Sequence, residues 1–358
     1  MAREPIVIDF WDVGQGDATV IRPTPDNAFI IDVGPRNSPL IDWILRNPRI
    51  NIEGLVLTHN DADHAGALAA LIDGAAVRIQ CVYFLQDRDK KKRPFAKLFS
   101  RLDDAYKSGE LKKILRLESP QVIWRDSSGA VELTLRYPSV MQNIPATSPN
   151  VTSAVVVLTA RNIVKVIWAS DAPLELVAKH CSGARPDYMV GPHHGAPVDR
   201  SKSAAEEWLR DIGAETILVS VGSNNTYPHP QKSFIRKSRH AGSRIVCTEL
   251  TKLCDKNRRT DVIKSHARYA VPPPNTGIAC RGTVRVMLSR NDDIIGDDLD
   301  NAHQEEIKKL QRPQCLLLAP RKNGASPHGQ LPKDFAKFFF SRCHVAFCSA
   351  GDADEVKR

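Results

Sequence analysis

Short hydrophobic runs, separated by Gly and Pro, alternate along most of the chain with stretches of helical periodicity. β-Branched runs bounded by turn residues are typical of strands, whereas apolar residues three or four apart indicate helices. The pattern predicts strands at 6–10, 18–22, 28–32, 54–57, 131–136, 154–158, 164–168, 188–190, 217–220, 244–248 and 283–288. It predicts helices at 40–46, 65–72, 174–180 and 204–211. This alternation indicates an α/β fold.

Two segments interrupt the alternation. Residues 86–118 join a charged run to an amphipathic stretch, which predicts a helical insertion over the face of the domain. Residues 251–276 are rich in basic residues and in proline, which predicts a loop insertion. We therefore expect one domain over residues 1–289 and a C-terminal extension of unknown role over residues 290–358. The extension is expected to contain a helix near 304–310 and a strand at 315–318.

Composition excludes several classes of protein. The 358 residues are 42% hydrophobic and carry 50 Lys and Arg against 41 Asp and Glu, so the chain is neither disordered, collagenous nor a small disulfide scaffold. No window approaches ~20 uninterrupted apolar residues, and the first residues run straight into a predicted strand. We expect a soluble, cytoplasmic protein without membrane partners, whose eight cysteines are mostly reduced thiols.

The formal charge of +9 is unevenly placed. Basic residues concentrate in one run at 88–93 and in a second part of the chain at 236–259. Such runs suit partners that carry phosphate, and solvated surface loops explain them equally well.

One segment is rich in metal-binding side chains. His59-Asn-Asp61-Ala-Asp63-His64 follows an apolar strand and precedes a helix. Two imidazoles and two carboxylates so close together repel one another or titrate abnormally unless a cation lies between them. His59 and Asp61 can face one ion, and Asp63 and His64 a second. The segment therefore predicts a site for divalent metal.

Two further strand ends carry residues of the same kind. Asp171 follows the strand at 164–168, and His193 and His194 follow the strand at 188–190. Each taken alone could be a helix cap or a buried polar residue. Together they place His and Asp at the strand ends of one sheet edge, where α/β proteins position their sites.

The ordered motifs resemble the metallo-β-lactamase fold superfamily, most closely the hydrolase domain of ComEC-type DNA-uptake proteins and their stand-alone relatives. They are Trp11-Asp-Val-Gly-Gln-Gly-Asp17, Ile31-Asp-Val-Gly34, Leu57-Thr-His-Asn-Asp-Ala-Asp-His64-Ala-Gly66, Ala169-Ser-Asp171, Pro192-His-His-Gly195 and Ser220-Val-Gly-Ser-Asn-Asn-Thr-Tyr-Pro-His-Pro230. The resemblance implies a four-layer αββα sandwich with a two-metal site at one edge, and a hydrolase that commonly acts on phosphodiesters.

The resemblance also implies roles for individual residues. The metal ligands it implies are His59, Asp61, Asp63, His64, Asp171 and His194, with Asp63 and Asp171 also counted as catalytic. His193 is then a substrate contact or proton donor, although the exchange of roles between His193 and His194 stays open. The residues it places behind the ligands or against substrate are Asp17, Asp32, Asn150, Ser153, Asn224, Tyr227 and His229. The chain departs from the superfamily in having no histidine between Ala65 and Ser170.

These features predict a metallohydrolase that uses two divalent ions, zinc or manganese, to activate a hydroxide for attack on a phosphodiester. The leading prediction is a nuclease acting on DNA or RNA. The alternatives are hydrolysis of a small phosphodiester or lactone, and a partner-dependent subunit of a multi-protein system, such as a defence system, that docks through its C-terminal extension.

A second metal site is a weaker prediction. Cys247, Cys254, His266 and Cys280 flank or lie within the insertion at 251–276 and supply the ligand count of a structural zinc site. Their spacing is irregular and lacks a Cys-x-x-Cys pair, so buried reduced thiols are the competing interpretation.

Overall fold

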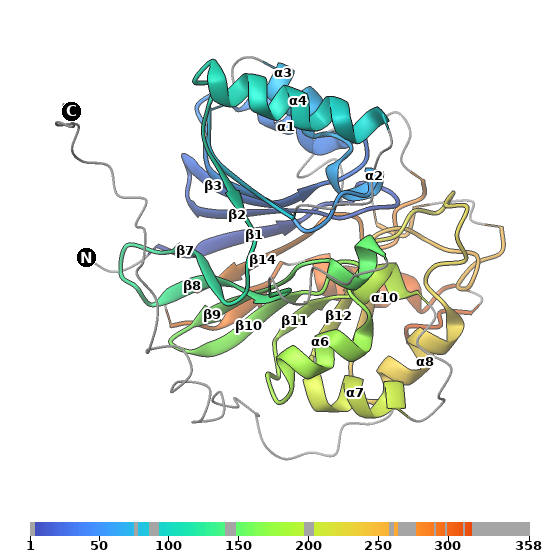
Figure 1. Cartoon of the computed structure of the whole chain (residues 1–358). Coiled ribbons are helices and arrows are strands. Elements are labelled where there is room, and N and C mark those ends of the chain that lie inside the picture. The colour runs from blue at the N-terminus through green and yellow to red at the C-terminus, as the bar shows by residue number, and fades with distance from the viewer. Residues whose placement is uncertain are drawn as a thin grey trace, which may run out of the picture.

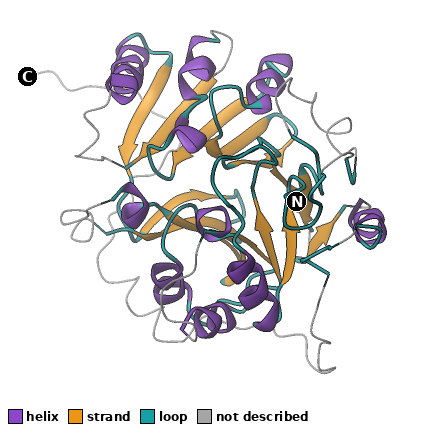
Figure 2. Ribbon diagram, turned by 90° about the vertical axis from the view of Figure 1, so that its right-hand side faces the viewer, coloured by secondary structure: helices purple, strands orange, loops and turns teal. Residues whose placement is uncertain are grey.

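Two β-sheets pack face to face with helices on both outer faces (Figures 1 and 2). The computed structural model describes residues 4–74, 78–85, 93–139, 148–196, 204–257, 261–263, 277–289, 291–297, 299–310 and 312–316. The four-layer αββα sandwich expected from the sequence is confirmed.

The first sheet has the strand order β15-β14-β1-β2-β3-β4-β5-β6. Its members are β1 (Ile6–Phe10), β2 (Ala18–Thr24), β3 (Asn27–Val33), β4 (Asn51–Leu57), β5 (Arg78–Phe84), β6 (Leu111–Arg116), β14 (Val284–Leu288) and β15 (Ile294–Gly296). Strands β3 to β6 are parallel, and the others pair antiparallel. The outer face is covered by α1 (Pro39–Arg46), α3 (Leu68–Asp73) and α4 (Arg93–Lys107). The short helix α2 (Ala62–Ala65) follows β4.

The second sheet has the order β13-β12-β11-β10-β9-β8-β7. It contains β7 (Gln121–Arg125), β8 (Val131–Tyr137), β9 (Val155–Ala160), β10 (Ile163–Trp168), β11 (Tyr188–Val190), β12 (Thr216–Val219) and β13 (Arg244–Cys247). Strands β10 to β13 are parallel. Helices α6 (Leu174–Cys181), α7 (Ala204–Ile212), α8 (Lys232–His240) and α10 (Leu299–Ile307) lie against this half, and the 3-10 turns η1 (Pro149–Thr152) and η2 (Pro192–Gly195) follow β8 and β11.

Apolar side chains form three layers that match this stacking. The middle layer, between the sheets, contains Phe10, Val156 and Trp168, and one outer layer lies between each sheet and its helices. Because β9 is covered on both faces, all six of its residues are buried, which explains its continuous apolar run.

Several elements differ from the sequence prediction. The helix expected at 65–72 is interrupted after α2, because the amide of Ala67 donates to the carbonyl of Gly34 (3.2 Å) instead of to its own helix. The helix expected within 86–118 is α4, and β6 after it forms an edge of the first sheet, so the described part of this segment belongs to the sandwich layers. Strands β5, β6 and β7 and helix α8 were not predicted, since their apolar runs are short or interrupted by charge.

The described part of the expected C-terminal extension packs on the same domain. β15 pairs with β14, and Ile307 of α10 lies in the layer beneath the second sheet. The strand expected at 315–318 is wrong where it is described, because residues 314–316 form a turn. The division of the chain at residue 289 stays a prediction. None of the described helices is long and apolar enough to cross a membrane.

Candidate metal centre

The residues of the predicted site meet where several strands end. His59, Asp61, Asp63 and His64 follow β4, Asp171 follows β10, and His193 and His194 lie in η2 after β11. The carboxyl ends of the parallel strands point to one edge of the sandwich, which brings residues more than a hundred positions apart into contact.

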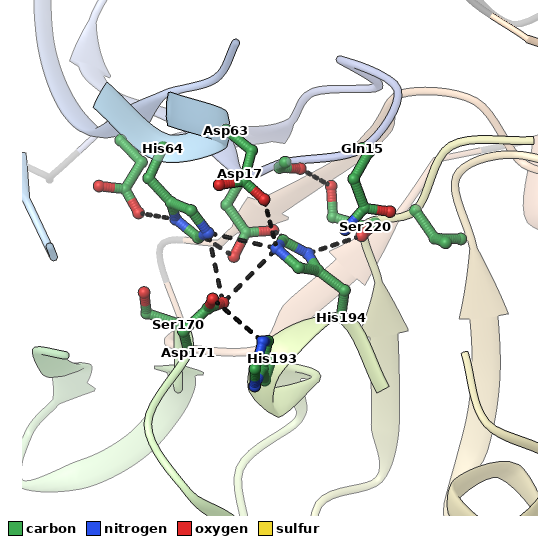
Figure 3. Close-up of polar contacts among 12 residues, drawn as sticks. Gln15, Asp17, Asp63, His64, Ser170, Asp171, His193, His194 and Ser220 are labelled. Atoms are coloured by element: carbon green, nitrogen blue, oxygen red, sulfur yellow. Dashed lines mark hydrogen bonds and ion pairs between the residues drawn. The ribbon is translucent and has the colours of Figure 1, made fainter. Parts of the chain in front are cut away.

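Three predicted ligands, His59, His64 and His194, point their Nε2 atoms at the carboxylate of Asp171, and Figure 3 shows the last two. The Nε2 of His59 lies 3.5 Å from Asp171 Oδ2. The Nε2 atoms of His64 and His194 lie 3.3 and 3.5 Å from Asp171 Oδ1 and 3.2 Å from each other. His59 thus faces one carboxylate oxygen of Asp171, and His64 and His194 face the other.

Asp61 and Asp63 extend these two sets. Asp61 Oδ2 is 3.5 Å from the Nε2 of His59, and Asp63 Oδ2 is 3.4 Å from the Nε2 of His194. Both carboxylates are partly exposed, with 34% and 30% of the side chain accessible. Asp61 thus lies with His59, as the sequence suggested, whereas Asp63 lies with His194, and the sharing of these residues between two ions stays a prediction.

The Nδ1 atoms of His64 and His194, which lie on the side of each ring away from Asp171, are engaged in hydrogen bonds. His64 Nδ1 lies 2.8 Å from Asp32 Oδ2, and His194 Nδ1 lies 2.9 Å from the backbone carbonyl of Ser220. A carbonyl and a carboxylate can only accept, so both Nδ1 atoms carry the proton. The Nε2 lone pairs of both rings are therefore turned towards Asp171, as metal-binding histidines require.

His59 is oriented by hydroxyl groups. Its Nδ1 lies 3.1 Å from the Oγ of Ser153 and 3.3 Å from those of Thr58 and Ser170. Ser153 also accepts a hydrogen bond from the amide of Asp171 (3.2 Å). Ser153 therefore lies behind the donor atoms, where it fixes the orientation of a ring and of a carboxylate.

The donor set fits divalent cations. The buried Nε2 of His59 and Oδ1 of Asp171 have no hydrogen-bond partner, although desolvating such atoms without a partner is costly. The two Nε2 lone pairs of His64 and His194 face each other at 3.2 Å, which is repulsive unless a positive charge lies beside them. Three imidazoles with carboxylate oxygens suit zinc or manganese.

Asp17 is near the same histidines but on their other side. It lies 3.7 Å from His194 Nδ1 and 4.0 Å from His64 Nδ1. Asp17, His64 and His194 form one of two groups whose donor atoms lie within 4.8 Å, and His59, His64 and Asp171 form the other. Because both Nδ1 atoms are already engaged, the donor atoms that could hold metal are those on the Asp171 side.

The comparisons with known proteins agree with this geometry. Residues 11–120 match the family model of the Metallo-beta-lactamase superfamily. The chain has the metallo-beta-lactamase fold. The resemblance to the superfamily is thereby confirmed over residues 11–120, whereas the closer likeness to ComEC-type hydrolases stays a prediction.

Solved structures of this fold are similar at low identity. The metallo-beta-lactamase fold protein YhfI from Bacillus subtilis is 11% identical, with 68% of this chain and 96% of that chain covered and a TM-score of 0.44. Yeast PDE1 is 12% identical, with coverage of 69% and 98% and a TM-score of 0.44. The short form of human tRNase Z is 15% identical, with coverage of 67% and 91% and a TM-score of 0.36. No curated protein matches the sequence.

Charge coupling within the candidate metal centre shifts the pKa of its groups. Burial raises the pKa of Asp171, but His64 and His194 outweigh it and hold the pKa well below the usual range. Burial lowers the pKa of His64 and of His194, but nearby carboxylates outweigh it and raise the pKa of His194 to about 9. The centre thus favours an ionised carboxylate and positive charge, as a cation site does.

His193 lies at the rim of the centre. Its side chain is 37% exposed, and its Nε2 is 3.5 Å from Asp171 Oδ2 and 3.3 Å from the amide nitrogen of Asn150. The ring of His229 lies 5.6 Å from that of His193, and Tyr227 stacks on His229 at 5.8 Å and 15°. His193 and His194 have left-handed backbone angles, which turn neighbouring rings to different sides. His194 is buried, whereas His193 is partly exposed, but both rings reach Asp171 at 3.5 Å, so the exchange of roles between them stays a prediction.

The remaining predicted residues are less central. Asn224 is exposed on the loop that carries Tyr227. Of the basic run at 236–259, Lys237 is buried and Arg239 donates to the carbonyl of Gln314 (2.9 Å), so these two are structural. Most of the run at 88–93 lies outside the described residues, as does His266, while Cys247, Cys254 and Cys280 are buried.

Thr58, Ser170 and Ser220 were not predicted to orient ligands. Thr58 donates to Asp32 through its amide and its hydroxyl at 2.8 and 2.6 Å, and so ties the β3 end to the β4 end. For Thr58 and Ser170 the sequence signal was a hydroxyl residue just after a strand that leads to a candidate ligand. Backbone acceptors such as the Ser220 carbonyl leave no signal in a sequence.

Proposed function

We propose that this chain is a metal-dependent phosphodiesterase that cleaves DNA or RNA. The observation that carries the proposal is the convergence of three imidazole Nε2 atoms on the two oxygens of the buried Asp171 carboxylate. A buried cluster of this kind does not stabilise the fold by itself, because burying nitrogen and oxygen atoms without hydrogen-bond partners lowers the free energy of unfolding.

His59 and Asp61 would hold one cation, His64, His194 and Asp63 a second, and Asp171 would contact both. Two bound divalent cations supply positive charge for the phosphoryl oxygens and water of lowered pKa. The likeness to ComEC-type hydrolases is also part of this proposal. It rests on the order of the sequence motifs and not on the sandwich fold.

The entrance residues would orient the substrate. His193 is the group at the rim that can contact a leaving oxygen, and burial lowers its pKa, which keeps the ring neutral near neutral pH. Asn150 holds this ring by its amide. Tyr227 is 62% exposed and its ring is stacked on His229, so its free face can receive a nucleobase.

Helix α8 offers phosphate contacts beside this entrance. The amide of Gln231, which precedes the helix, donates to the carbonyl of Gly195 in η2 (2.8 Å), so the helix begins next to the centre. Lys232 and Arg236 are exposed and one turn apart on α8. Such a pair would contact successive phosphates of a nucleic acid with strong dependence on salt.

The first experiment incubates protein loaded with Mn²⁺ or Zn²⁺ with labelled DNA, labelled RNA and bis(p-nitrophenyl) phosphate. We expect cleavage that Asp171→Ala or His64→Ala reduces by about two orders of magnitude or more, since each removes a donor shared by the cluster. His240→Ala is the matched control, because His240 is an exposed histidine that faces Glu206. Metal-dependent cleavage at the wild-type rate in both ligand variants would show that the assignment is wrong.

A second experiment separates nucleic acid from small diesters as the substrate. Lys232→Glu with Arg236→Glu, and separately Tyr227→Ala, should raise KM for DNA or RNA about tenfold while leaving bis(p-nitrophenyl) phosphate hydrolysis unchanged. Lys179→Glu on α6 is the control for a charge reversal at an exposed lysine. Equal effects on both substrates would favour a small phosphodiester or lactone.

A further inference from the structure

Four buried cysteines gather outside the metal centre from four separate segments. Cys247 ends β13, Cys254 lies in the turn after it, Cys280 precedes β14, and Cys315 lies in the turn beyond α10. All four belong to the apolar layer beneath the second sheet. Cys315 was not among the residues that the sequence suggested for a second metal site.

Backbone hydrogen bonds hold these segments side by side. The amide of Arg281 donates to the carbonyl of Cys247 (3.1 Å), and the amide of Cys280 donates to that of Thr248 (2.9 Å). The amide of Arg312 donates to the carbonyl of Cys254 (3.3 Å). The backbone segments that carry these cysteines are therefore neighbours in the fold.

Hydrogen-bonding groups lie near two of the four sulfur atoms. Hydrogen bonding from the Cys315 side chain and from the amides of Gln314 and Cys315 lowers the pKa of the Cys254 thiol to about 7. The Sγ of Cys280 lies 3.4 Å from the Nε2 of His303. Amide and imidazole N–H groups aimed at sulfur stabilise thiolates, which is how zinc sites built from cysteine are supported.

We propose that Cys247, Cys254, Cys280 and Cys315 together bind one structural zinc ion. Four thiolates are a complete tetrahedral ligand set, so the site needs no open position and no residue outside the described part of the chain. His303 then donates to the Cys280 thiolate as a supporting residue. This site does not rest on the proposed hydrolase function.

The local structure explains what such an ion would do. Between β13 and β14 the described chain has only the isolated bridge between Glu249 and Ala279 as sheet pairing. The segment at 312–316 has a single turn. Zinc would join both segments to the end of β13, where regular secondary structure is scarce.

Binding requires the sulfurs to draw together. The donor groups that already lie within 4.8 Å of one another in the described residues are the two in the metal centre. Zn–S bonds of about 2.3 Å in a tetrahedron place sulfurs about 3.8 Å apart.

The test uses the full chain with the active-site donors removed by His64→Ala and Asp171→Ala. After dialysis against a mild chelator we expect about one zinc per chain by mass spectrometry, and its X-ray absorption should show four sulfur neighbours at about 2.3 Å. Cobalt in place of zinc should give sulfur-to-cobalt charge-transfer absorption. In the same background, Cys254→Ser with Cys315→Ser should lose this metal, and Cys181→Ser, a buried cysteine of α6, should keep it.

The spectroscopic arm needs no cysteine variant, so misfolding of the serine variants does not decide the outcome. Absence of zinc from the active-site variant, or coordination by nitrogen and oxygen only, would overturn the proposal. A disulfide between Cys254 and Cys315, detected by mass of the non-reduced peptides, would overturn it as well. Because active-site metals have nitrogen and oxygen ligands, failure of the hydrolase proposal would look different from failure of this one.

Discussion

Asp32 gives the sharpest test of how the metal centre is held. Its buried carboxylate accepts hydrogen bonds from the amide and hydroxyl of Thr58 and from His64 Nδ1, at 2.8, 2.6 and 2.8 Å. In Asp32→Asn, the amide oxygen can keep the bond to the Thr58 amide, and the new NH2 faces His64. The ring of His64 must then accept at Nδ1, which moves its proton to Nε2 and points that proton at Asp171.

The magnitude follows from this change of tautomer. Losing one charge-assisted hydrogen bond costs about 1.5–3 kcal/mol, and losing such a partner of a metal-binding histidine lowers affinity about 10- to 100-fold. At about 1.4 kcal/mol per factor of ten, the two figures agree. We therefore expect metal affinity about 10- to 100-fold weaker, with the fold retained.

The assay is competition for Zn²⁺ or Mn²⁺ with a chromogenic chelator, with circular dichroism as a check of folding. Asp9→Asn is the matched control, because Asp9 is an equally buried aspartate of the first sheet that pairs with Arg22 and Arg285. Affinity of Asp32→Asn within about twofold of the wild type, in a folded protein, would refute the tautomer argument.

Two further predictions concern the loops around the site. Gly16 has φ of +135°, and a Cβ there would lie 2.2 Å from the carbonyl oxygen of Asp63, so Gly16→Ala should displace this backbone and lower metal content and activity at least tenfold. Gly242→Ala, at φ +99° with open space around it, isolates the cost of backbone strain, and equal losses in both variants would contradict the clash. Burial and Glu249 raise the pKa of Asp12 well above its usual range, so stability from this group is present at low pH and is lost as pH rises through its folded pKa. The Tm of the wild type should therefore fall relative to that of Asp12→Asn between about pH 5 and about pH 9, and a constant difference would contradict the shift.

The part of the site that lies within one short segment was predictable because it depends only on residues that are neighbours in the sequence. The segment from His59 to His64 follows a strand, and its charge density marks it without any tertiary information. Asp171 and the His193-His194 pair stand at strand ends, so an α/β interpretation already places them at one edge. The alternation of apolar runs was enough for most of the strands and for four of the helices.

Other parts could not be predicted, because they depend on contacts between distant segments. The orientations of His193 and His194 follow from the left-handed backbone of η2 and from the Ser220 carbonyl, neither of which a residue pattern encodes. The 315–318 run was interpreted as a strand because hydrophobicity alone does not distinguish a strand from a buried turn. That turn brings Cys315 to Cys254.

By itself, the sequence determined the α/β alternation and the candidate metal ligands, since hydrophobic periodicity and local charge density are properties of neighbouring residues, and its resemblance to a known superfamily added the four-layer sandwich. The tertiary structure decided which atoms of those side chains meet, because ring orientation depends on hydrogen bonds from Asp32, Ser153 and the Ser220 carbonyl. It also decided where β15 and α10 pack against the sandwich, since pairing at a sheet edge and burial beneath a sheet depend on how the whole chain packs.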